Sequence, residues 1–174
     1  MSAASKLIVQ QAPSLNVDII VEDPRWESVT PNIVEAISGF LPVIAANLEG
    51  FASDAAISAC IMLSNNADVQ ELNRDYRNKD KPTNVLSFPQ YDYEDLPEAG
   101  EFNIGDIAIA YETIEQEAAD DKISIHDHTL HMVVHGILHL CGYDHIEEDE
   151  AEVMEALEVK ILGQINIENP YKDE

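Results

Sequence analysis

The chain has 174 residues, of which 45% are hydrophobic, and its formal net charge at pH 7 is −25. This length and composition predict one domain with a full hydrophobic core. The sequence contains no run of about 18 apolar residues that would span a membrane, and its two cysteines exclude a disulfide framework. With no apolar secretory signal at the N-terminus, we expect a cytoplasmic protein. The 34 acidic residues against nine basic ones argue against unspecific binding of nucleic acid, which depends on neutralising phosphates.

The first half of the chain is predicted to alternate strands with helices. Its β-branched residues give 17–23 strand character. A capping hydroxyl at Thr30, followed by Pro31, predicts the start of a helix that Pro42 kinks or breaks. An apolar run bounded by polar turns then predicts a buried strand at 55–64, with its cysteine as a buried free thiol.

The middle of the chain contains two further helices and two further strands. The sequence predicts a helix over 65–77, which Asn65 or Asn66 can cap, and a strand over 83–89. A polar loop with proline and glycine separates this strand from the next one, at 104–110. The stretch YETIEQEAADD (111–121), which follows directly, is predicted to form a helix or a helical turn.

Two helices are expected at the C-terminal end. Ser124 can cap a helix over about 126–141, and Gly142 lies where a left-handed C-terminal cap belongs. The last helix covers about 147–162 and ends before Gly163. The order β, α, β, α, β, β, α, α, α predicts an α+β fold, in which a mixed sheet of about four strands packs with helices. We expect the C-terminal helices to carry the chemistry.

All six histidines of the chain lie between residues 126 and 145. His131, His135 and His139 are four residues apart and therefore share one face of a helix. The glycine turn that follows can bring His145 back toward His135 and His139. Catalytic zinc sites take three protein ligands and leave a fourth position to water. The spacing therefore predicts a metal site of His135, His139 and His145 that holds one Zn²⁺ per chain, or Ni²⁺, since these ligands discriminate poorly between the two ions.

The residue after the first histidine of this set is Gly136. The spacing H-x-x-x-H-x-x-G-x-x-H is also that of metzincin proteases, which carry a glutamate at this place as general base for the zinc-bound water. Without that glutamate, peptide hydrolysis is disfavoured. A metal ion can still lower the pKa of its water toward about 7. Hydrolysis of a phosphodiester would need this and cationic groups for the developing charge.

Four of the nine basic residues lie within 74–81, which gives this acidic chain one locally basic segment. Arg77 is a candidate catalytic residue, because the planar fork of an arginine suits two phosphate oxygens. Asp106 is a second candidate, since it could orient a histidine or accept a proton. The candidate substrate-binding residues are Lys79, Lys81, Asn84 and Ser87.

Three segments of the sequence are similar to those of one known family. The stretch HGILHLCGYDH (135–145) resembles the H-G-x-L-H-L-x-G-Y-D-H signature of the YbeY family, the bacterial endoribonucleases of rRNA maturation. YRNKDKPTNVLSFP (76–89) and GDIAIA (105–110) resemble the two other sequence blocks of that family. The resemblance covers about 55–162 and implies that 1–174 form a single domain of this type.

The resemblance implies a metal-dependent, single-strand-specific endoribonuclease that acts in 16S rRNA 3′-end maturation and late-stage ribosome quality control. Metal-bound water would attack a phosphodiester while Arg77, which matches the important arginine of the family, steadies the phosphate. The implied partners are ribosomal RNA and ribosomal proteins, and the acidity of the chain favours recruitment by a protein. Two alternatives stay open: a ribosome-assembly factor with a structural metal, closed by a fourth ligand such as Cys141, and a zinc protease.

Overall fold

The computed structural model describes residues 12–144 and 147–172. The strands are β1 (Ser14–Val21), β2 (Ala56–Ser64), β3 (Val85–Pro89) and β4 (Glu101–Ala110). The helices are α2 (Arg25–Ser28), α3 (Ile33–Ala46), α4 (Asn66–Arg77), the 3-10 helix η1 (Tyr93–Asp95), α5 (Tyr111–Asp121), α6 (Ile125–Leu140) and α7 (Glu148–Gly163). The four strands form one sheet in the order β1-β2-β4-β3, in which β1, β2 and β4 are parallel and β3 is antiparallel to β4. The predicted single α+β domain with a four-stranded mixed sheet is confirmed.

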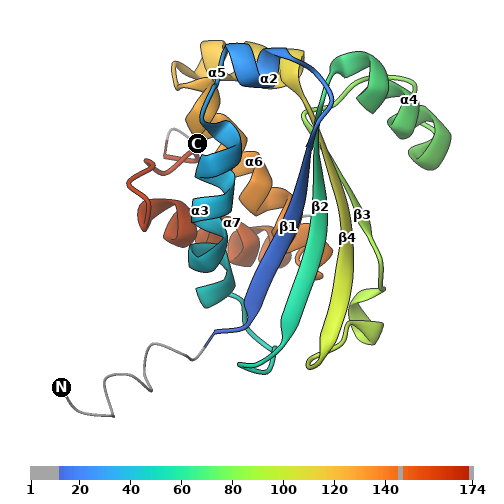
Figure 1. The fold of residues 1–174 in the computed structure, drawn as a ribbon, viewed down its shortest axis with the longest axis vertical. Coiled ribbons are helices and arrows are strands. Elements are labelled where there is room, and N and C mark those ends of the chain that lie inside the picture. The colour runs from blue at the N-terminus through green and yellow to red at the C-terminus, as the bar shows by residue number, and fades with distance from the viewer. Residues whose placement is uncertain (1–11, 145–146, 173–174) are drawn as a thin grey trace.

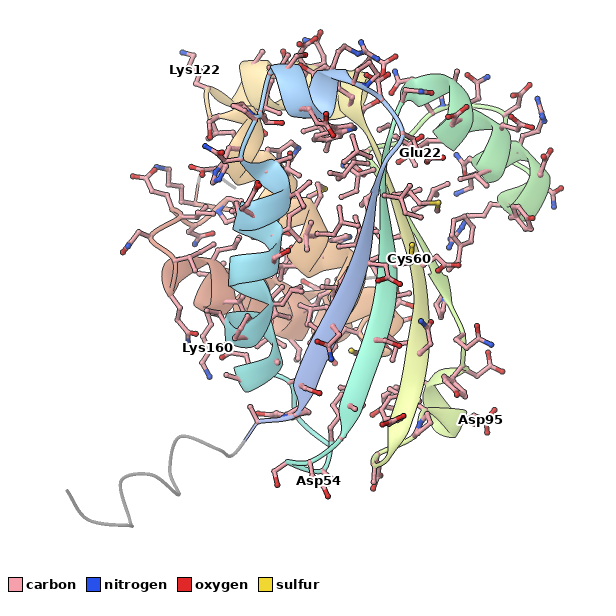
Figure 2. The ribbon with its side chains drawn as sticks, in the orientation of Figure 1. Glu22, Asp54, Cys60, Asp95, Lys122 and Lys160 are labelled. Atoms are coloured by element: carbon pink, nitrogen blue, oxygen red, sulfur yellow. The ribbon has the colours of Figure 1, made fainter. Side chains whose placement is uncertain are left out.

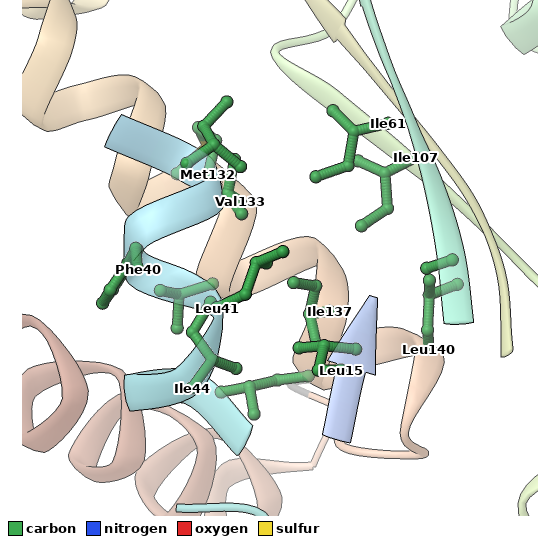
Figure 3. Close-up of a cluster of buried hydrophobic side chains, with 14 of the residues drawn as sticks. Leu15, Phe40, Leu41, Ile44, Ile61, Ile107, Met132, Val133, Ile137 and Leu140 are labelled. Atoms are coloured by element: carbon green, nitrogen blue, oxygen red, sulfur yellow. The ribbon is translucent and has the colours of Figure 1, made fainter. Parts of the chain in front are cut away.

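One face of the sheet is covered by helices α3 and α6, with α7 packed on the outer side of α6 (Figure 1). The side chains between sheet and helices are apolar and almost entirely buried. Figure 3 shows Ile61 and Ile107 of the sheet facing Val133 and Ile137 of α6. Because α6 lies between the sheet and α7, most of its circumference is buried, as its many apolar residues predict.

The opposite face of the sheet is only partly covered. Helix α4 packs on one end of it through Val69, and the rest carries polar and half-buried side chains. Strand register places Asp18, Cys60 and Asp106 side by side on neighbouring strands of this face. Cys60 is therefore half-buried, and the prediction that its thiol is buried is wrong. Side chains alternate between the two faces along β2, so that Ile61 rather than Cys60 points into the core.

The expected start of the first long helix is also wrong. The hydroxyl of Thr30 donates to the carbonyl of Trp26 at 2.7 Å, at the end of the short helix α2, and α3 begins only at Ile33. Pro42 does not break α3, which continues to Ala46. Pro42 lies on the exposed side, where water can bond the carbonyl that its missing N–H leaves free. Among the described residues, no helix has both the length and the apolar character that a membrane span requires.

Candidate functional site

Helix α6 carries five of the six histidines of the chain, and two local signals determine where it begins and ends. The hydroxyl oxygen of Ser124 accepts a hydrogen bond from the N–H of Asp127 at 3.0 Å, which confirms the predicted N-terminal cap. At the other end Gly142 has a φ of +95°, and its N–H donates to the carbonyl of His139 at 3.0 Å. The N–H of Tyr143 donates to the carbonyl of Leu138 at 3.0 Å, which completes a Schellman motif. The predicted left-handed cap after α6 is therefore confirmed.

The rings of His135 and His139 approach each other through their Nε2 atoms. Their Nε2 atoms lie 3.2 Å apart, and the two rings are nearly perpendicular, at 80°. Two nitrogens that bind one tetrahedral zinc ion at about 2.0–2.1 Å are separated by roughly 3.3 Å. The two imidazoles therefore fit the positions of two ligands to one ion.

The third predicted ligand, His145, lies outside the described residues. Within 12–144 and 147–172, no group of three or more His, Cys, Asp or Glu side chains is placed to hold an ion, so this part of the chain supplies two members of the predicted set. Cys141 does not join them, because its side chain packs in the hydrophobic core and burial raises the pKa of its thiol to about 12. A buried neutral thiol is a poor metal ligand.

The buried carboxylate of Glu158 contacts His135, on the side of the ring that faces away from His139. Glu158 of α7 has 0% exposure, and its Oε1 lies 2.6 Å from His131 Nε2, 3.3 Å from His135 Nδ1 and 3.0 Å from the donating hydroxyl of Tyr171. Burial alone would raise the pKa of Glu158, but the hydrogen bonds from His131 and His135 lower it to about 2. His131, whose place the spacing left open, is thus buried against α7.

Sequence reasoning missed Glu158. In α7, Val153 is exposed, whereas the buried positions are Met154, Glu158, Ile161 and Leu162. Glu158 follows Met154 by four residues and precedes Leu162 by four, so it interrupts an apolar stripe at helical spacing. A charged residue in the centre of such a stripe was the available signal.

A second pair, of a buried histidine and a partly exposed glutamate, connects α6 with α5. His128 Nε2 lies 2.8 Å from Glu117 Oε1, and the amide of Asn84 donates to the same oxygen at 3.0 Å. His128 is therefore buried, although a position near a helix start predicts a solvated side chain. The hydrogen bond from His128 is the main cause that lowers the pKa of Glu117. Asn84, which is predicted to bind substrate, lies directly before β3 and joins this strand to the Glu117–His128 pair.

Arg77 ends α4 and reaches the open edge of the sheet. Its guanidinium donates to the main-chain carbonyl of Ser87 and lies 5.6 Å from the centre of the Phe88 ring. The hydroxyl of Ser87 in turn donates to the carbonyl of Gly136 at 3.4 Å, next to His135 in α6. The structure therefore links Arg77 to the histidine helix through β3, and Ser87, predicted to bind substrate, is buried in that link.

The two predicted lysines follow Arg77 in an exposed turn. The N–H of Lys81 donates to the carbonyl of Lys79 at 2.9 Å, and neither lysine makes an ion pair with another described residue. Other lysines, such as Lys122 and Lys160, lie on the opposite side of the molecule from α4 (Figure 2). The end of α4 is thus a separate basic segment.

Among the described residues, the structure does not bring Asp106 together with the histidines of α6. Asp106 is exposed on the sheet face opposite α6, where it lies beside Cys60, while the next residue, Ile107, points toward α6. The alternation of a strand separates the two side chains. Orientation of a histidine of α6 by Asp106, one of its two expected roles, has no support in this geometry.

Fold and site together define a class: a single α+β domain with paired histidines at the end of a buried helix and an arginine at the neighbouring sheet edge. The family model Endoribonuclease YbeY matches residues 22–166. The chain belongs to this family.

Individual relatives match over most of their length. The Endoribonuclease YbeY of Rhodospirillum rubrum is 47% identical over 85% of this chain and 77% of its own, and that of Sphingopyxis alaskensis is 48% identical over 86% and 89%. The Endoribonuclease YbeY of Paramagnetospirillum magneticum is 40% identical over 92% and 98%. The solution structure of TM1509 from Thermotoga maritima has a TM-score of 0.55 at 23% identity, over 86% of this chain and 91% of that one, and shows the same fold.

Proposed function

We propose that this protein is a metal-dependent endoribonuclease that cleaves single-stranded RNA in 16S rRNA 3′-end maturation and late-stage ribosome quality control in the cytoplasm. The observation that carries the proposal is the 3.2 Å approach of the Nε2 atoms of His135 and His139, on a helix linked to Arg77. The similarity to relatives that are named Endoribonuclease YbeY supports the reaction class.

His135, His139 and His145 would hold the ion, which is Zn²⁺ or Ni²⁺. When bound, such an ion acts as a Lewis acid and lowers the pKa of a coordinated water. Arg77 is the residue of this chain that would bind the scissile phosphate, because its guanidinium offers several donors in one plane. Lys79 and Lys81, beside it, would contact the neighbouring phosphates of the strand.

The net charge of −25 favours a protein partner for RNA delivery, because most of the surface repels phosphates. Basic ribosomal proteins have the complementary charge. The same charge favours the second candidate function, a ribosome-assembly factor in which the metal is structural. The two functions differ in whether RNA is cleaved, which the following experiment measures.

The experiment combines metal content and RNA cleavage on the same purified samples. The wild type, His139→Ala and the matched control His126→Ala are compared; His126 lies exposed at the other end of α6, beside Asp127. The substrate is a single-stranded oligonucleotide of the 16S 3′ end, with its duplex as control. We expect His139→Ala to lose metal and cleavage together and His126→Ala to keep both. Cleavage by metal-free His139→Ala would refute the proposal, and metal without cleavage in the wild type would favour the structural role.

A further inference from the structure

The ring of His135 is contacted at both of its nitrogens. Nδ1 lies 3.3 Å from Glu158 Oε1, and Nε2 lies 3.2 Å from His139 Nε2. A neutral imidazole carries one N–H, and a carboxylate oxygen can only accept. The contact with Glu158 therefore favours the proton on Nδ1 and leaves the lone pair of Nε2 directed at His139. This tautomer is the one in which Nε2 can bind an ion.

The carboxylate of Glu158 also contacts two other side chains, those of His131 and Tyr171. His131, one turn before His135 in α6, contacts its Oε1 at 2.6 Å, and Tyr171, beyond the end of α7, donates to the same oxygen at 3.0 Å. With 0% exposure, the carboxylate has little freedom to move. One oxygen atom thus receives contacts from α6 and from the C-terminal segment.

The other carboxylate oxygen, Oε2, is buried and has no hydrogen-bond partner among the described residues. A buried, unpaired carboxylate oxygen is unfavourable for stability, and such groups are rare in folded proteins. Packing alone would favour an apolar residue at this position, as at Met154 and Leu162 on the same face. The unpaired oxygen is a cost that an apolar residue would avoid, so the contacts of Oε1 with His131, His135 and Tyr171 are what distinguishes a glutamate at this position.

From this arrangement we propose that Glu158 is a positioning residue for the metal site. It fixes the ring orientation and the tautomer of His135 so that Nε2 of His135 and Nε2 of His139 meet at one point. This inference rests on the proposed metal-dependent function, and Glu158 itself contacts neither the ion nor the substrate.

The chain offers a matched control in Glu117. It makes the same kind of contact, 2.8 Å to a buried histidine of α6, but its partner His128 lies about two turns before His135. Glu117→Gln and Glu158→Gln each remove one carboxylate charge from a pair with a buried histidine of α6, although Glu117 is 37% exposed and Glu158 is fully buried. Only the second pair includes a proposed ligand.

The test measures Zn²⁺ dissociation constants of the metal-stripped wild type and both variants by competition with a chromophoric chelator. Absorption spectra of the Co²⁺-loaded proteins and thermal unfolding of the metal-free proteins are recorded in parallel. We expect Glu158→Gln to bind Zn²⁺ about 10- to 100-fold more weakly and to change the Co²⁺ spectrum. Glu117→Gln should match the wild type in both. A lower unfolding temperature of either variant is compatible with this expectation.

Equal Zn²⁺ affinity and equal Co²⁺ spectra in the wild type and Glu158→Gln would overturn the positioning role and leave the proposed function intact. A wild type that binds no ion would overturn both. If Glu158→Gln does not fold, Glu158→Asp provides the same comparison, because it keeps the buried charge and moves the carboxylate away from His135 by one methylene. Its Zn²⁺ affinity should also fall by about tenfold or more, and unchanged affinity would contradict the proposal.

Discussion

Gly136 of α6 lies directly against Ile107 of β4: a Cβ at Gly136 would come within 2.9 Å of the Cδ1 atom of Ile107. The position after His135 therefore faces the sheet, while His135 contacts α7. A glutamate at 136 would be buried against β4 and could not serve as a general base beside His135 and His139. The glycine thus follows from the close packing of α6 on the sheet, and this packing disfavours the protease alternative.

Gly136→Ala should destabilise the protein by about 1–3 kcal/mol, because the added methyl group overpacks the contact with Ile107. The matched control is Gly39→Ala in α3, where a Cβ meets no atom within 4 Å. This control should be neutral or stabilise the protein by up to about 1 kcal/mol, because alanine favours a helix over glycine. Urea denaturation measures both changes. Equal stability of Gly136→Ala and the wild type would contradict the packing argument.

Local signals in the sequence predicted much of the fold. Asn65 caps α4, Ser124 caps α6 and Gly142 ends α6, as the sequence indicates, because each signal acts within a few residues. Thr30 failed as a helix cap because its hydroxyl bonds to Trp26 of a short helix that no periodicity indicates.

The long-range parts of the site could not be read from the sequence in the same way. The histidine spacing predicts the meeting of His135 and His139, which are one turn apart. The partner of His135, Glu158, comes from another helix, and the pairing depends on how α7 packs on α6. Whether Asp106 faces the histidines depends on strand alternation, since a shift by one residue reverses the face.

Arg77→Ala should reduce RNA cleavage by about 10- to 1,000-fold, because removing a donor that stabilises developing charge has an effect of this size. Arg77 is exposed, so the free energy of unfolding should change by less than about 1 kcal/mol. Metal content should stay at the wild-type level. The control is Arg74→Ala on the same helix, whose guanidinium pairs with Asp75 at 3.0 Å. If both variants lost activity equally, general charge rather than a phosphate contact at Arg77 would be responsible.

The two cysteines should differ in their reactivity. Burial raises the pKa of Cys141 to about 12, and burial together with the charge of Asp106 raises the pKa of the half-buried Cys60. Iodoacetamide reacts with thiolates, so at pH 8 Cys60 should react slowly and Cys141 only after unfolding. Peptide mass spectrometry before and after addition of denaturant measures both rates, and Cys60→Ser identifies the slow reaction. Native labelling of Cys141 at the rate of Cys60 would contradict the buried position of Cys141.

The Glu117–His128 pair predicts a dependence of stability on acid. Hydrogen bonds from His128 and Asn84 lower the pKa of Glu117 in the folded state. The ionised form is favoured by folding, so the contribution is fully present above the ordinary pKa of a glutamate and is lost as pH falls through the lowered value. Because the side chain of Glu117 is 37% exposed, solvent screening limits this contribution to about 1 kcal/mol.

Glu117→Gln should therefore be less stable than the wild type at pH 7, and the difference should shrink as the pH is lowered below the ordinary pKa of a glutamate. Urea denaturation at a series of pH values measures the difference. Glu35→Gln, on the exposed side of α3, controls for the loss of one negative charge from an acidic protein. A difference between Glu117→Gln and the wild type that stayed constant down to pH 2 would show that the carboxylate charge does not stabilise the pair, and that hydrogen-bond geometry alone holds β3 and α5 against α6.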